Sequence, residues 1–165
     1  MIKEVDAVEI QMVLHLPLDA ASVPVSRQVL DACLQRLGVT PDTRADIALA
    51  LSEACANVIR HAGSDQEYQV LVRTRNGQCA IEVINSGLGD DCEAGKEGTN
   101  GFTLNGDPAA ATAENGRGLK IIDAVVDNLQ LTGSKRLGTT VSFEKTLAWV
   151  PGAPGRRLFS ADGDS

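Results

Sequence analysis

The pair Asn76-Gly77 limits the folds open to this chain more than any other short stretch. It separates two runs rich in β-forming residues, Tyr68 to Arg75 and Cys79 to Asn85. Asn-Gly between such runs is the strongest short hairpin signal, because both residues accept the positive φ that a type I′ turn needs. Strands joined by two residues are antiparallel, whereas parallel strands need a long crossover. The sequence therefore predicts an antiparallel pair at its centre.

End signals and periodicity predict the remaining elements. Thr40 followed by Pro41 is typical of a helix start, Gly38 closes the helical pattern before it, and Gly63 closes the one after it. The expected elements are a strand within 5–18 that stops at Pro17, helices from Ser22 to Leu37, from about Pro41 to His61 and from Gly118 to about Leu129, and closing strands from Leu129 to Thr132 and from Thr139 to Lys145.

This order of elements predicts an α/β two-layer sandwich, with helices on one face of a mixed, mostly antiparallel sheet. The repeated strand-helix alternation of a doubly wound fold is missing. With 165 residues, of which 43% are hydrophobic, the chain can bury the core of one domain. We expect that domain to span 1–147, followed by a flexible tail over 148–165 that is rich in Pro, Gly and polar residues.

Composition excludes several classes of function. A net charge of -7 disfavours a protein that binds the phosphate backbone of nucleic acid. The first residues lack the pattern of a signal peptide and no run approaches a membrane span, so we expect a cytoplasmic protein without a membrane partner. The cysteines show no C-x-x-C pair and are interpreted as buried or free thiols: Cys33, Cys55, Cys79 and Cys92.

The segment from about 88 to 115 is rich in Gly, Asn, Asp and Ala and has few large apolar residues. It is too long for a plain connection in a compact domain. Two interpretations remain open, a functional lid and a disordered insert.

Three polar residues recur at intervals of four on the second helix: Glu53, Asn57 and His61. They lie beside an apolar stripe that must face the sheet, made of Ile47, Leu51, Ala54 and Val58. Side chains at the edge of such a stripe are partly desolvated but can still reach a cavity, where a carboxylate base or a metal-binding amide would be useful. The alternative is a solvated helix flank that happens to be polar.

Glycine-rich stretches follow in a fixed order after this helix. They are I-N-S-G-L-G at 84–89, directly after a strand, N-G-R-G-L at 115–119, opening a helix, and G-T-T-V at 138–141, entering the last strand. Glycine lets a backbone approach a ligand closely, and a glycine-rich helix start offers N–H groups to phosphate. A lone G-x-G is weak evidence, whereas the ordered set favours a nucleotide site.

The set E-x-x-x-N-x-x-x-H, glycine box, variable lid, G-x-G-hydrophobic and G-T-T resembles the boxes of the Bergerat-fold, or histidine-kinase-like, ATPases. The short format with a helix ahead of the E-x-x-x-N helix looks most like the anti-sigma factor serine kinases of sporulation and stress response. The resemblance runs from about Leu14 to Thr146.

The resemblance implies ATP and Mg²⁺ as cofactors and gives roles to several residues. Glu53 matches the general base and Asn57 the Mg²⁺ ligand, while His61 matches a residue often found at the end of this motif but can equally be structural. The positions that match nucleotide-contacting residues are Asn85, Gly87 and Gly89 in the first glycine box, Gly116, Arg117, Gly118 and Leu119 near the phosphates, and Thr139 and Thr140 beneath the adenine. Arg27 sits where these kinases carry an arginine used in partner contact and phosphotransfer, although it can also be an ordinary solvated residue.

The chain departs from the family at Asn85, where the first glycine box normally begins with an aspartate that accepts a hydrogen bond from adenine. An amide oxygen can still accept that bond but lacks the charge that strengthens it. The departure leaves weaker ATP binding, altered base preference and lost catalysis as alternatives.

Two functions follow from the resemblance. The first is a kinase that binds a sigma factor and phosphorylates an anti-anti-sigma partner of the STAS type, and that forms a homodimer. The second is a pseudokinase that captures the same partners without phosphotransfer. A detached histidine-kinase catalytic domain is disfavoured because no phosphoacceptor helix precedes the nucleotide boxes.

Overall fold

The structure is a computed structural model that describes residues 9–61, 67–85, 101–102, 113–134 and 138–159. Its elements are β1 (Glu9–Pro17), α1 (Ser22–Leu37), α2 (Pro41–His61), β2 (Glu67–Arg75), β3 (Gln78–Asn85), β4 (Gly101–Phe102), α3 (Ala113–Val125), β5 (Asn128–Ser134), β6 (Gly138–Thr146) and α4 (Pro154–Phe159).

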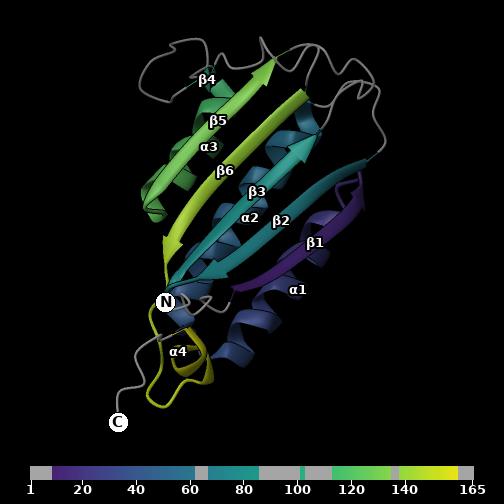
Figure 1. Ribbon diagram of the computed structural model, residues 1–165. Coiled ribbons are helices and arrows are strands. Elements are labelled where there is room, and N and C mark those ends of the chain that lie inside the picture. Colours follow the sequence, from purple (N-terminus) through teal and green to yellow (C-terminus); the bar gives the residue numbers. More distant parts are fainter. Residues whose placement is uncertain (1–8, 62–66, 86–100, 103–112, 135–137, 160–165) are drawn as a thin grey trace, which may run out of the picture.

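These elements form the predicted two-layer sandwich. Six strands lie in the order β1-β2-β3-β6-β5-β4, and every neighbouring pair is antiparallel. Figure 1 shows α1, α2 and α3 on one face of this sheet. The predicted hairpin is confirmed, since Asn76 and Gly77 join β2 to β3 with φ of 53° and 78°.

The sheet buries one face because its residues alternate. Inward-facing side chains pack against α2, while the other face of the sheet is open to solvent. The buried positions of the two hairpin strands are Tyr68, Val70, Val72 and Thr74 in β2, and Cys79, Ile81, Val83 and Asn85 in β3. Three cysteines are free thiols, as predicted, and burial raises the pKa of both Cys55 and Cys79, which makes them poor nucleophiles.

The first two helices end where the sequence predicts. Gly38 closes α1 with a φ of 92°, a left-handed conformation that glycine adopts without strain. Thr40 caps α2, because its Oγ1 accepts a hydrogen bond from the Thr43 N–H at 3.4 Å.

The third helix differs from the prediction. It begins at Ala113 rather than at Gly118, and it ends at Val125. Ala-Glu-Asn ahead of the glycines can be helical, so Gly116 and Gly118 lie inside the helix instead of before it. The predicted lid over 88–115 is therefore helical from residue 113, and it also contributes β4, which pairs with β5. The other lid residues lie outside the described part.

The prediction of a flexible tail from residue 148 is wrong for 148–159. We call residues 147–159 the C-terminal hook. Trp149 forms a β-bridge with Val39, and its ring stacks on that of Phe159 with centroids 6.1 Å apart. Burial of Phe159 and Ala153 fixes α4 on the end of α1, so the folded unit extends through Phe159. Residues 160–165 lie outside the described part.

Candidate active site

The first feature of the site is the approach of Glu53 to the second glycine box. α2 and α3 lie side by side, and a Cβ added to Gly118 would lie 2.9 Å from Oε1 of Glu53. Glycine at 118 therefore leaves the space that the half-buried Glu53 carboxylate needs. Two motifs that are far apart in the sequence meet at this point.

The polar row of α2 runs from the interior to the surface. Asn57 is only 4% exposed, and Glu53 is partly exposed. His61, the last residue of the helix, is exposed to solvent. The expected apolar stripe beside them is buried. A solvated flank does not explain a buried amide one turn from a carboxylate, since burying polar groups is unfavourable without a partner. The exposure of His61 favours an ordinary surface role for that residue.

The second feature is the pairing of the first glycine box with the G-T-T stretch. Asn85, the last residue of β3, lies opposite Thr139 in β6. Both face the helical layer, because each lies two residues from a buried valine of its own strand, Val83 in β3 and Val141 in β6, and Asn85 is 1% exposed. A buried side-chain amide at the end of a strand is suited to a specific hydrogen bond with a ligand.

Thr140 is predicted to lie together with Thr139 beneath the adenine, but the structure places the two side chains on opposite faces of the sheet. Thr140 pairs with Ile84, and the alternation of β6 directs its side chain to the open face of the sheet. Only Thr139 of the pair shares a face with Asn85.

The residues of the second glycine box divide between surface and core. Arg117 is exposed, and Leu119 is buried in the core. Gly116 lies in α3, as does Gly118. Gly87 and Gly89 lie outside the described residues.

Arg27 lies at the contact between α1 and α2. Its Nη1 donates a hydrogen bond to Oγ of Ser52 at 3.3 Å, and Ser52 directly precedes Glu53. Arg27 also borders the seam between the two helices, together with Leu30, Asp31, Leu34, Arg44, Ile47 and Ala48.

Two supporting residues were missed by sequence reasoning. Ser52 holds Arg27, and Lys145 links three elements: its Nζ donates to Asp46 of α2 at 3.1 Å and to the carbonyl of Val125 at the end of α3 at 2.6 Å. Lys145 therefore holds α3 against α2, and with it Gly118 against Glu53. A charged residue at an inward position of β6 is the signal that could have revealed it.

The donor set fits a magnesium nucleotide. Asn57 offers a buried amide oxygen, an oxygen ligand of the kind that Mg²⁺ accepts, and Gly118 leaves space beside Glu53 that a Cβ would fill.

A profile of the histidine kinase-like ATPase domain matches residues 16–145. The chain belongs to the histidine kinase-like ATPase domain family. Its strand order and helical layer are those of the Bergerat fold, and ATP binding is the property of this family.

Curated relatives cover most of the chain. The serine-protein kinase RsbW of Bacillus cereus is 27% identical over 134 residues, which is 80% of this chain and 82% of that protein. The serine-protein kinase RsbW of Bacillus velezensis is 28% identical over 137 residues, or 81% of this chain and 84% of that protein.

Among the described helices, none has the length and apolar character needed to cross a membrane.

Proposed function

We propose that this protein is an anti-sigma factor and an ATP-dependent serine/threonine kinase. It sequesters a sigma factor and phosphorylates an anti-anti-sigma antagonist of the STAS type. The observation that carries the proposal is the position of Glu53, whose carboxylate lies against Gly118 of the second glycine box. The serine-protein kinase names of the relatives support the same reaction class.

In this reaction Glu53 accepts the proton of the attacking hydroxyl. The hydroxyl oxygen of the partner's serine or threonine forms a bond to the γ-phosphorus of ATP as the bond to the β-γ bridging oxygen breaks, which yields a phosphoprotein and ADP. This base stands on a rigid element, because Lys145 bonds both to α2, which carries Glu53, and to the end of α3.

Asn57 is the proposed ligand for Mg²⁺ through its Oδ1. Bound Mg²⁺ would neutralise charge on the phosphates, as it does in other phosphoryl transfers. The low exposure of Asn57 supports this role, since a buried amide is held in one orientation for a ligand.

Arg27 is the proposed contact to the protein partner. Its hydrogen bond to Ser52 places a cation at the residue next to Glu53, where an arriving acidic group could replace the serine. The partners, the homodimer and the cytoplasmic location belong to this proposal.

A pseudokinase remains as a second candidate because Asn85 stands where the family carries aspartate. Asn85 is buried opposite Thr139, so a neutral amide would meet the base at this position. In that case the protein captures its partners and transfers no phosphate.

Radiolabelled ATP with Mg²⁺ and candidate sigma and STAS proteins distinguishes the two. The kinase predicts label on the STAS protein that survives acid, as phosphoserine does and phosphohistidine does not. Glu53→Gln should abolish labelling, whereas Glu82→Gln is the matched control because Glu82 lies on the open face of β3. Partner capture without labelling would favour the pseudokinase.

A further inference from the structure

The C-terminal hook lies beyond the residues that match the family, since the match ends at 145. It is nevertheless joined to the domain by regular backbone contacts. The Thr40 N–H donates to the carbonyl of Ala148 at 2.9 Å, and the Val150 N–H donates to that of Gly38 at 2.8 Å. These bonds attach the hook to the junction between α1 and α2.

Close packing also fixes α4, the last element of the hook. A Cβ on Gly155 would lie 2.5 Å from the Trp149 ring and 2.8 Å from the carbonyl oxygen of Leu37, and one on Gly38 would meet Ala153. Glycine is therefore required at both places for α4 to seat on the end of α1. The outer side of α4 is held in one position relative to the last turn of α1.

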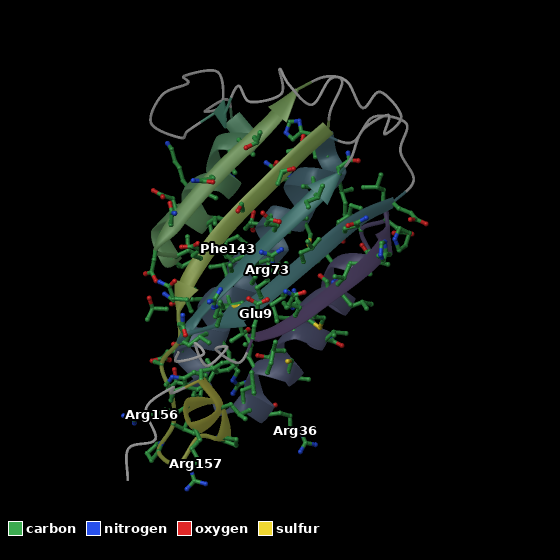
Figure 2. All side chains as sticks on the ribbon, viewed as in Figure 1. Glu9, Arg36, Arg73, Phe143, Arg156 and Arg157 are labelled. Carbon is green, nitrogen blue, oxygen red and sulfur yellow. The ribbon has the colours of Figure 1, made fainter. Side chains whose placement is uncertain are left out.

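That outer side is cationic. Arg156, Arg157 and Leu158 are all exposed, and Leu158 retains 48% of its accessible surface. Arg36, in the last turn of α1, is also exposed, at the same end of the molecule (Figure 2). Figure 2 shows Arg36, Arg156 and Arg157 at the same end of the molecule, directed away from its body.

The charge of this end contrasts with that of the whole protein. Over the described residues of the hook and the last turn of α1, every charged side chain is an arginine, whereas the chain carries a net charge of -7. Within the described part of the chain, the acids nearest to this end in sequence are the partly exposed Asp31 and Glu144 and the exposed Asp42. Arginine is enriched at protein interfaces, where its planar fork pairs with carboxylates.

We propose that the hook and the last turn of α1 form a docking surface for an acidic segment of another protein. Carboxylates of that segment pair with Arg36 and Arg157, and one of its apolar side chains covers Leu158. Charge complementarity supports this occupant, because a short acidic segment meets only the arginines of this end, whereas a long phosphate backbone would also meet the acidic remainder of the chain. Arg156 already takes part in another interaction, so the proposal rests on the other two arginines.

This surface is separate from the candidate active site. α4 lies at the opposite end of the sheet from the end of β3, which carries Asn85 (Figure 1). A partner docked on the hook leaves the nucleotide site open, and its binding requires no nucleotide. The proposal does not depend on kinase activity.

Fluorescence anisotropy tests it with the full chain and a short fluorescein-labelled peptide rich in glutamate and leucine. The wild type should bind this peptide at low salt, and Arg36→Glu/Arg157→Glu should weaken binding by about tenfold, as expected for reversal of two exposed charges. Leu158→Ala should weaken it by about threefold through lost apolar contact. Circular dichroism and the thermal midpoint verify that each variant is folded.

The matched control is Arg73→Glu/Arg75→Glu, which changes the net charge equally at exposed positions of β2. It should bind the peptide nearly as the wild type does. The proposal is overturned by equal losses in the two double variants, by absence of binding, or by equal binding of a peptide with glutamine in place of glutamate. Tighter binding of a single-stranded oligodeoxynucleotide than of the acidic peptide would also overturn it.

Discussion

Gly118→Ala should slow phosphotransfer while leaving the protein at least as stable. The new Cβ would lie 2.9 Å from Oε1 of Glu53, whereas an unstrained carbon–oxygen contact is about 3.3 Å or longer. The carboxylate must therefore move by roughly 0.4 Å or more, which is close to the tolerance of about 0.5 Å for a catalytic constellation. A misplacement of about 1 Å can cost on the order of 100-fold, so we expect a loss in kcat of about 10-fold to 100-fold.

Stability should change in the opposite direction. Gly118 lies within α3, where replacing glycine by alanine favours the helix by up to about 1 kcal/mol. The contact with the flexible end of Glu53 offsets part of this gain. The thermal midpoint should therefore be equal to or above that of the wild type, and a loss of activity cannot be attributed to unfolding.

A double-mutant cycle isolates the cause. Glu53→Asp shortens the side chain and withdraws the carboxylate from position 118, so adding Gly118→Ala to it should cost much less than in the wild type. Phosphotransfer rates of the four proteins, with ATP affinity measured separately, provide the test. An equal cost of Gly118→Ala in both backgrounds would refute the proposed contact as its cause.

Four further substitutions test other parts of the site and fold. Glu53→Ala should abolish phosphotransfer but barely change ATP affinity, because a base acts in the transition state; a labelling rate equal to that of the wild type would disprove its role. Asn57→Ala should remove most of the Mg²⁺ dependence of ATP binding, so an unchanged dependence argues against a metal ligand. Asn85→Asp should tighten ATP binding by about 1 kcal/mol in calorimetry, through a charge-assisted hydrogen bond; weaker ATP binding would contradict an acceptor role for this residue. Phe159→Ala should lower the free energy of unfolding by about 3 kcal/mol in denaturant titrations, since the ring is buried against Trp149, and a loss under 1 kcal/mol would show that the hook contributes little.

Local sequence signals correctly predicted the boundary between the first two helices and the turn of the β2-β3 hairpin. Gly38, Thr40 and Pro41 set the end of α1 and the start of α2, and Asn76-Gly77 set the central hairpin. The start of α3 was missed because glycines normally end or precede a helix, whereas Gly118 is retained inside α3 beside Glu53. A tertiary contact outweighs helix propensity at that position.

The hook was missed for a related reason. α4 has six residues, too few to show helical periodicity, and its stability comes from Trp149 and Phe159 packing on a distant part of the chain. The opposite faces of Thr139 and Thr140, in contrast, follow from the two-residue period of a strand and could have been predicted.

The candidate site was predicted as a set of motifs, but not as a geometry. The order of the motifs in the sequence indicated which residues belong together. Pairing of β3 with β6 then brings Asn85 opposite Thr139. The approach of Glu53 to Gly118 depends on how α2 packs on α3, which no local pattern contains.

Calorimetric titration of the wild-type protein with ATP, ADP and GTP in the presence of Mg²⁺ tests the central claim most directly. The claim is that Glu53, Asn57, Asn85 and Gly118 line one adenine nucleotide site. The predicted result is saturable binding of ATP and ADP at one site, weaker binding of GTP, and loss of the Mg²⁺ effect in Asn57→Ala. Absence of binding by any of the three nucleotides, or binding of GTP more tightly than ATP, would contradict it.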